Sequence, residues 1–180
     1  MVPRYTPEDV GALWSDAHKL RTWLRVELAA CEAMADAGLV PAADLAALRD
    51  AAGQVDFEAL ARRADEIERT TKHDVIAFLS AFEELAGPAS RHIHYGLTSS
   101  DVLDTALALI LGEALELVER ELELLAGAIR ERTLEHRRTP MMGRSHGIHG
   151  EPISFGFVLA GWYAEVRRGQ ARLRAARAEI

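Results

Sequence analysis

The feature that most constrains this sequence is a helical pattern that runs unbroken from Val102 to about Glu135. Apolar residues form two stripes along it, with spacings that alternate between three and four residues, as in helices packed lengthwise. Because two stripes require burial on more than one side, the helix belongs inside a bundle. The first stripe contains Leu103, Leu107, Ile110, Ala114 and Leu117, and the second contains Leu111, Leu115, Val118, Leu122, Leu125 and Ile129.

A helix of this length is out of proportion to the chain. At 1.5 Å per residue it spans ~50 Å, which is too long for the core of a lone globule of 180 residues. The pattern therefore requires partner helices that this chain barely supplies.

Shorter helical patterns surround the long one, and together they predict an all-α fold. The hydrophobic fraction of 49% allows a real core, and the charged fraction of 27% is that of an ordered protein. The predicted helices cover 7–38, 41–52, 57–69, the segment from 75 onward, and 153–180.

The bulk properties exclude several classes of protein. A net charge of −7 argues against a general nucleic-acid or membrane-surface binder, which would be basic. Cys31 is the single cysteine, so one chain forms no disulfide framework and no thiolate cluster. No apolar run approaches the ~20 residues of a membrane span, and no signal peptide is recognised. We expect a cytoplasmic protein with no membrane and no nucleic-acid partner.

Polar islands interrupt the helices at 71–74, 94–101 and 143–151. Each lies at a predicted helix end and carries histidine or hydroxyl side chains. Thr70 or Thr71 is expected to cap the helix that runs through Val75. Lys72 and His73 would face an anion at the same helix end.

The second and third islands extend this pattern. Thr98 to Asp101 has the sequence of a helix N-cap, where free N–H groups and hydroxyls suit a carboxylate. The third island is predicted to be a loop between Pro140 and Pro152, built around His146, whose side chain type exchanges protons near neutral pH. If the three ends converge, they form a donor-rich site for a substrate with several carboxylates or a phosphate.

Taken in order and spacing, these motifs resemble those of bacterial adenylosuccinate lyases. The matching segments are Lys72-His73-Asp74, the run from His94 to Asp101, and the run from Gly143 to Pro152. Arg4-Tyr5 and Trp14 fit the same pattern, and the resemblance covers essentially the whole chain.

The resemblance places the chain in the fumarase/aspartase superfamily. It implies a small N-terminal helical domain at 1–97, followed at 98–180 by the first long helices of the superfamily bundle. The implied reaction is β-elimination of fumarate from adenylosuccinate, giving AMP, and the parallel step on the succinylated carboxamide ribotide of purine biosynthesis. No metal and no cofactor are implied, and the assembly is a homotetramer.

The resemblance also assigns roles to individual residues. His146 resembles the general acid for the leaving nitrogen, and His73 its close partner at the substrate. Thr98 and Ser99 resemble the pair that holds a succinyl carboxylate. The remaining implied substrate contacts are Lys72, Asp74, His94, Arg4 and Tyr5, whereas His149 is expected to be structural or to support a residue that contacts the substrate.

The resemblance leaves one catalytic group unaccounted for. The family's base is a serine on a flexible loop much later in the chain, and nothing in this sequence matches that loop. We therefore expect the chain to be an N-terminal portion of a lyase, inactive by itself.

Alternative interpretations remain at this stage. The protein could be another fumarate-releasing lyase, of the argininosuccinate lyase or fumarase type. It could also be a helical assembly module without chemistry, with the histidines incidental in solvated turns. A metal site at His146 and His149 with His92 or His94 is disfavoured, because the spacing is wrong and no carboxylate ligand is evident.

Overall fold

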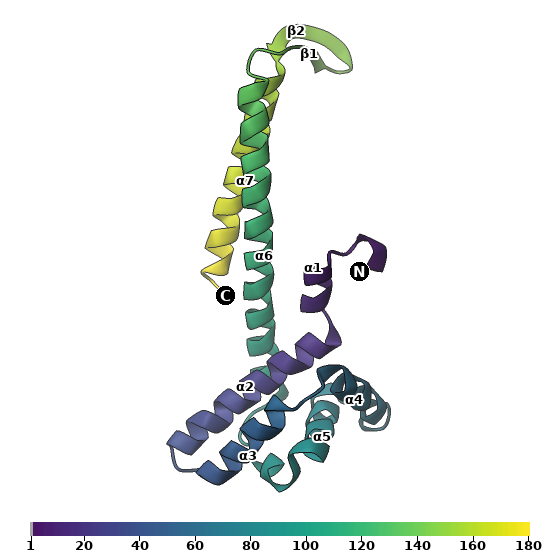
Figure 1. Ribbon diagram of the computed structural model, residues 1–180, viewed down its shortest axis with the longest axis vertical. Helices are drawn as coiled ribbons and strands as arrows, with labels where there is room; N and C mark the ends of the chain where they lie inside the picture. The colour runs from purple at the N-terminus through teal and green to yellow at the C-terminus, as the bar shows by residue number, and fades with distance from the viewer. Residues whose placement is uncertain (1) are drawn as a thin grey trace. The chain divides into compact units, whose positions relative to one another are not determined.

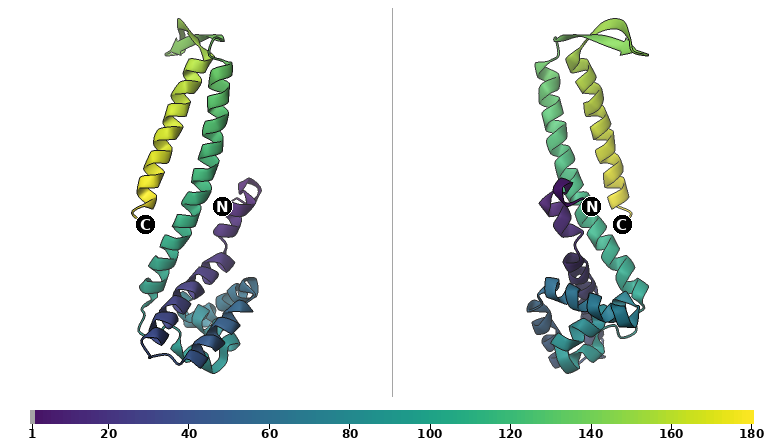
Figure 2. Two further views of the ribbon diagram at one scale, coloured as in Figure 1. Left: turned by 60° about the vertical axis from the view of Figure 1, so that its left-hand side comes forward. Right: turned by 90° about the vertical axis from the view of Figure 1, so that its right-hand side faces the viewer.

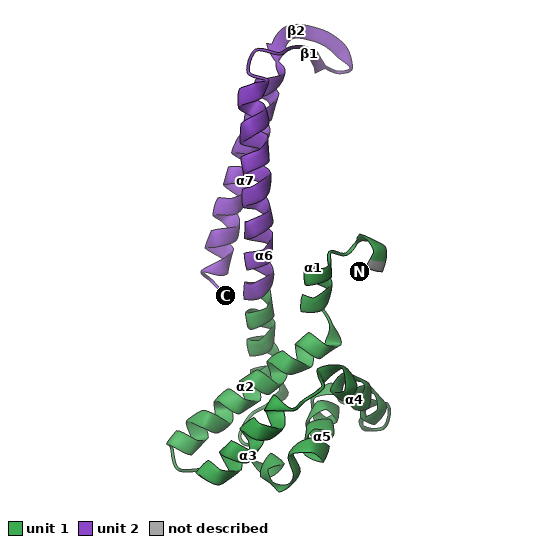
Figure 3. Cartoon of the chain, viewed as in Figure 1, with its two compact units in different colours: residues 1–111 green, residues 112–180 purple. Residues whose placement is uncertain are grey.

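The computed structural model describes residues 2–180, which divide into two compact units, one up to Leu111 and one from Gly112 onward (Figure 1, Figure 3). The described chain is helical apart from one two-stranded antiparallel sheet, so the all-α prediction is confirmed with this exception. Within residues 2–180 no helix combines the length and the apolar character needed to span a membrane.

The first unit holds the shorter helices and the start of the long one. In order these are η1 (Pro3–Tyr5), α1 (Glu8–Leu13), α2 (Asp16–Asp36), α3 (Ala42–Gly53), α4 (Phe57–Thr71), α5 (Asp74–Ala86) and η2 (Gly87–His92). The long helix α6 (Ser99–Glu135) begins in this unit and continues into the second. The second unit adds β1 (Pro140–Ser145), β2 (Ile148–Ser154) and α7 (Phe155–Arg177).

The N-terminal helical pattern is interrupted where a single helix was predicted. The chain leaves α1 at Trp14, and α2 restarts with Ser15 as its N-cap, whose hydroxyl accepts the backbone N–H of His18 at 3.1 Å. Because Ser followed by Asp16 is a strong helix start, the local cap overrides the continuous apolar spacing. The prediction of one helix over 7–38 is therefore wrong.

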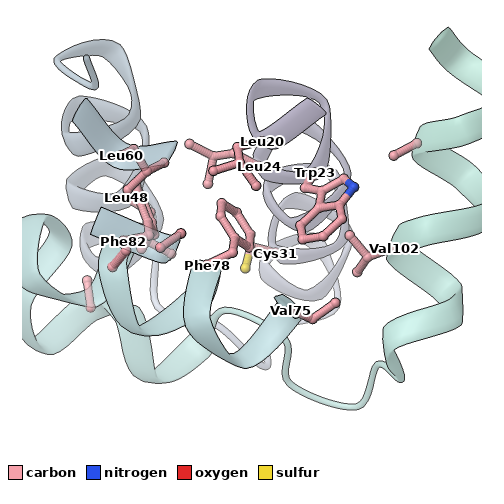
Figure 4. Close-up of a cluster of buried hydrophobic side chains, with 14 residues drawn as sticks. Leu20, Trp23, Leu24, Cys31, Leu48, Leu60, Val75, Phe78, Phe82 and Val102 are labelled. Carbon is pink, nitrogen blue, oxygen red and sulfur yellow. The ribbon is translucent and has the colours of Figure 1, made fainter. Parts of the chain in front are cut away.

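The core of the first unit is formed by α2, α3, α4 and α5, with the start of α6 (Figure 4). Phe78 is fully buried, and its ring meets Trp23 edge-on at a centroid distance of 5.6 Å. This edge-to-face contact between the two rings stabilises the fold beyond the free energy gained by burying them. The other large buried side chains are Leu24, Leu48, Val75, Phe82 and Val102.

The second unit is a pair of antiparallel helices joined by the hairpin, with α7 running beside the C-terminal part of α6 (Figure 2). Gly156 brings the helices together, because a Cβ there would lie 2.6 Å from both Thr133 O and Arg137 Cα. Polar contacts then cross between the helices: Arg167 and the Gln170 amide both donate to Glu123, each at 2.9 Å, Arg174 donates to Glu119 at 2.8 Å, and Arg177 donates to Glu116.

Candidate functional site

The first polar island lies between α4 and α5. Lys72 closes α4 in the left-handed conformation, with a φ of 54°. His73 takes the N-cap position of α5, where its Nδ1 accepts the backbone N–H of Ile76 at 3.4 Å. The prediction that Thr70 or Thr71 caps this helix is wrong, because both residues lie in the last turn of α4 and the imidazole supplies the acceptor.

The cap contact selects a tautomer of His73. Asp74 Oδ1 lies 3.5 Å from the same Nδ1, but this oxygen accepts the Val75 N–H at 2.8 Å. Since Nδ1 does not accept and donate at once, we assign it as the acceptor of the cap. The neutral ring then carries its proton on Nε2. The side chain is 47% exposed, so Nε2–H is available as a donor to an anionic ligand.

The second island ends in a capping arrangement at the start of α6. Asp101 Oδ2 accepts the Thr98 backbone N–H at 2.8 Å and the Thr98 hydroxyl at 3.1 Å. The backbone bond, followed by the hydroxyl bond, holds the pKa of Asp101 below its ordinary value. The predicted N-cap is confirmed, and it leaves Ser99, half-buried in the first turn, beside helix N–H groups that lack an intrahelical acceptor.

His94 begins the same island in an unusual backbone conformation. Its φ is 62°, and its ring and backbone N–H both contact the buried carboxylate of Glu27 on α2. Sequence reasoning missed Glu27 because it reads as an ordinary helix glutamate, and 67 residues separate it from its partner. A usable signal was its position between the apolar residues Leu24 and Cys31, on the face of α2 that is buried.

The third island is a β-hairpin, whereas a loop was predicted. β1 and β2 pair antiparallel, with Ser145 opposite Ile148. His146 and Gly147 connect the strands with φ angles of 55° and 74°. A two-residue connection with both residues left-handed is a type I′ turn, whose twist matches that of the strands. His146 is therefore exposed at the tip of a defined turn.

Two features keep this hairpin in register. Gly143 lies at the irregularity between Met142 and Arg144, and a Cβ there would approach Glu151 O to 2.7 Å. Across the strands, Arg144 Nη2 lies 3.4 Å from His149 Nε2. Since a guanidinium only donates, this nitrogen of His149 is the acceptor. The expectation that His149 is structural fits this cross-strand contact.

The N-terminal pair is also locally ordered. Arg4 and Tyr5 belong to the short 3₁₀ turn η1. Within it the guanidinium carbon of Arg4 lies 4.7 Å from the centre of the Tyr5 ring. The pair is exposed, so a cation and a phenol remain available to a ligand.

The predicted site residues divide between the two units. Lys72, His73, Asp74, His94, Thr98 and Ser99, with Arg4 and Tyr5, lie in the first unit, and His146 lies in the second. Each island is ordered by its own cap, turn or carboxylate contact, and each presents donors. Within residues 2–180 no group of three or more His, Cys, Asp or Glu side chains could hold a metal ion.

Comparisons with known proteins agree on one group of enzymes. A family model described as lyase matches residues 7–180. The adenylosuccinate lyase of Synechocystis sp. is 53% identical over 173 residues, which cover 96% of this chain and 39% of the relative. The adenylosuccinate lyase of Bacillus subtilis is 42% identical over 180 residues, which cover 100% of this chain and 41% of the relative.

A solved structure gives the same result for the fold. The crystal structure of the 3-carboxy-cis,cis-muconate lactonizing enzyme from Pseudomonas putida superposes with a TM-score of 0.87 at 34% identity. The superposition covers 98% of this chain and 41% of that enzyme. The chain thus spans about two fifths of the length of the proteins it matches.

Proposed function

This chain belongs to the lyase family whose model matches its residues 7–180, and we propose that it is the N-terminal part of an adenylosuccinate lyase. The reaction is β-elimination of fumarate from adenylosuccinate to give AMP, and the parallel elimination from the succinylated carboxamide ribotide in purine biosynthesis. The observation that carries the proposal is 53% identity to an adenylosuccinate lyase over 96% of this chain. The exposed donors at the islands support it.

The chemistry assigns a distinct task to each island. A base removes the proton beside a substrate carboxylate and forms an aci-carboxylate, which then expels the purine nitrogen with the electron pair of the C–N bond. His146, at the exposed tip of the type I′ turn, donates the proton that the departing nitrogen requires. The base itself is a serine outside this chain.

The first unit supplies binding groups in this proposal. Thr98 and Ser99 hold one carboxylate of the succinyl group at the N-terminus of α6, where the helix dipole favours negative charge. His73 donates from Nε2 to the substrate near the leaving group. Lys72, Asp74 and His94 are further contacts, and Arg4 with Tyr5 contacts the nucleotide end.

The dianionic intermediate explains why the site needs so many donors. Hydrogen-bond donors that are already oriented stabilise charge that develops in the transition state more than charge in the substrate. His73 is oriented by its cap before substrate arrives, whereas the Thr98 hydroxyl donates to Asp101 in the free protein and must exchange that bond for one to the substrate carboxylate. No metal or organic cofactor is part of the proposed reaction.

The assembly is part of the same proposal. The two-striped pattern of α6 fits a helical bundle, and we infer a cytoplasmic homotetramer with an N-terminal domain at 1–97 and the start of the bundle at 98–180. Active sites in this assembly draw residues from several chains, so His146 and His73 need not act within one chain.

A turnover assay tests the proposed function. The full-length protein is incubated separately with adenylosuccinate and with argininosuccinate, and fumarate release is followed by its absorbance. Release from adenylosuccinate alone supports the proposal, whereas release from argininosuccinate alone assigns the other lyase. No release from either supports an assembly module. The 180-residue chain, assayed alongside, is expected to be inactive because it lacks the base.

A further inference from the structure

Glu27 is a buried carboxylate in the core of the first unit. Its side chain is 0% exposed, on the same face of α2 as Trp23 and Leu24. A charge taken out of water costs several kcal/mol unless it is paired and hydrogen-bonded. Something in the structure must therefore compensate Glu27.

His94 provides that compensation through two separate hydrogen bonds. Glu27 Oε2 accepts the His94 backbone N–H at 2.8 Å, and Glu27 Oε1 lies 2.6 Å from His94 Nδ1. The same carboxylate thus fixes both the backbone and the ring of His94. The two bonds hold His94 at a φ of 62°, a conformation that non-glycine residues seldom adopt.

A second contact from α2 fixes the neighbouring residue. Cys31, one helical turn after Glu27, donates its thiol to the His92 carbonyl at 3.3 Å. Burial, with the nearby charges of Glu27 and Glu32, raises the pKa of Cys31 to about 11, so the thiol keeps its proton and remains a donor at neutral pH. The segment 92–94 is therefore attached to α2 at two points.

The contact with Glu27 also selects the ring nitrogen that is left for a ligand. An ionised carboxylate only accepts, so His94 Nδ1 carries the proton in this contact. Nε2 is the nitrogen that remains, on a side chain that is 18% exposed. His94 is joined to the start of α6 by a short turn, in which the Leu97 N–H donates to the His94 carbonyl at 3.3 Å.

We propose that Glu27 is a positioning residue that fixes the backbone and the tautomer of His94, so that Nε2 is left as an acceptor for a hydrogen-bond donor of the substrate, such as the N–H that carries the succinyl group, beside Thr98 and Ser99. This inference rests on the proposed function, because it takes the ligand at α6 to be the succinyl group. The simpler explanation is that Glu27 only fastens a loop to α2. The two explanations differ in one respect: only the positioning role requires the His94 ring for Glu27 to influence kcat/KM.

Substitution of Glu27 in the full-length protein is the first test. Glu27→Gln keeps the shape but offers one acceptor and one amide donor, so it no longer satisfies both the N–H and the Nδ1–H of His94. Loss of a charge-assisted hydrogen bond predicts a fall in kcat/KM for adenylosuccinate of about tenfold or more. The matched control is Glu32→Gln, an exposed glutamate on the same helix that pairs with Arg49.

A double-mutant cycle shows whether the effect passes through His94. His94→Asn keeps a donor near the position of Nδ1 and tolerates positive φ, but it removes Nε2. We expect His94→Asn to fold and to raise KM, and Glu27→Gln to have almost no further effect on kcat/KM in that background. An equal loss from Glu27→Gln in both backgrounds would overturn the proposal, as would an unchanged kcat/KM in the single variant.

A spectroscopic measurement covers the case in which Glu27→Gln does not fold. In protein labelled with 15N-histidine, the His94 signals are those missing from His94→Asn. A protonated Nδ1 in the unaltered protein supports the proposal, and an unprotonated Nδ1 overturns it. The assay of the wild-type protein separates the proposed function from the role of Glu27. If wild type releases no fumarate, the proposed function fails. If it does release fumarate, the ratio of kcat/KM between Glu27→Gln and wild type tests the role of Glu27 alone.

Discussion

The phenylalanine pair of α5 in the first unit and two aromatic residues of α7 in the second unit are buried very differently. In the first unit Phe78 and Phe82 are 0% and 1% exposed, inside a core made by several helices. In the second unit Phe157 and Trp162 are 72% and 53% exposed, although both belong to a long, regular helix. The first unit has a core of its own, whereas the helices of the second leave apolar side chains uncovered.

This difference bears on the pattern of α6. Val118, Leu124 and Leu125 in the second unit are between 45% and 65% exposed, although Val118 and Leu125 belong to a predicted buried stripe. Apolar faces of this extent are normally covered by other helices. Since the chain spans 39% of the length of its relative from Synechocystis sp., we propose that the remaining helices of a longer lyase cover them.

The largest expected effect on stability separates the two units directly. Phe78→Ala removes a fully buried ring and is expected to destabilise the first unit by about 3–5 kcal/mol. Phe157→Ala, in the same 180-residue chain, should change the free energy of unfolding by about 0.5 kcal/mol or less. Urea denaturation followed by circular dichroism measures both. Equal losses would contradict the contrast in burial.

A glycine pair on α7 tests how the second unit holds together. Gly156→Ala places a methyl group against the backbone of Thr133 and Arg137, and we expect a cost of about 1–3 kcal/mol. The control is Gly161→Ala, whose new Cβ meets nothing within 4 Å. That change should stabilise the helix by up to about 1 kcal/mol. Hydrogen exchange of α7 amides reports both, and protection that survives Gly156→Ala would argue against the close helix contact.

A smaller effect is expected from acid at the start of α6. Hydrogen bonds from Thr98 lower the pKa of Asp101, so the folded state gains stability from its ionised form. This gain is present above the unfolded-state pKa and is lost as the pH falls through the lowered folded pKa. The difference in unfolding free energy between wild type and Asp101→Asn should therefore have its full value at neutral pH. It should decrease as the pH falls below 3.8, the ordinary pKa of an aspartate side chain.

The control for the acid experiment is Asp104→Asn, an exposed residue of the same helix. Urea denaturation over a range of pH compares both variants with wild type. A difference for Asp101→Asn that stays constant down to the lowest pH would show that the capping carboxylate is not responsible.

The smallest effect is expected from the charged pairs between α6 and α7. Arg174 is 59% exposed and its partner Glu119 is 20% exposed. Such a pair contributes at most about 1 kcal/mol and is screened by salt. Arg174→Gln should therefore lower the stability of the second unit slightly in dilute buffer and negligibly in 1 M salt. A loss as large as that of Gly156→Ala would mean that ion pairs, rather than close packing, hold these helices together.

The sequence predicted the parts of the fold that depend on repeated spacing or on a single cap. The apolar stripes located α6, and Thr98 with Asp101 located its start, because hydroxyl and carboxylate caps are frequent there. The break at Ser15 was missed since apolar spacing continues across it, although Ser15-Asp16 carried the signal. The hairpin was missed because glycine and proline were interpreted as loop formers, while His146-Gly147 suits a two-residue turn.

The sequence proposes candidate site residues, but it does not give their geometry. The resemblance to a family named the histidines and the hydroxyls, whereas the structure revealed what orients them. His73 is held as a helix cap, and His94 is held by Glu27 from a distant part of the chain. The spacing of apolar residues along α2 indicates that Glu27 lies on the buried face, but it does not indicate which distant group compensates its charge.

The central claim is that His146 donates a proton to the departing nitrogen, and its most direct test is kcat for fumarate release by the full-length protein. His146→Gln removes the proton donor while keeping a polar side chain at the hairpin tip. We predict a fall in kcat of about 10²–10⁴-fold, while His149→Gln, which alters the cross-strand contact to Arg144, retains most of the wild-type rate. A His146→Gln variant that turns over adenylosuccinate at the wild-type kcat would contradict the account.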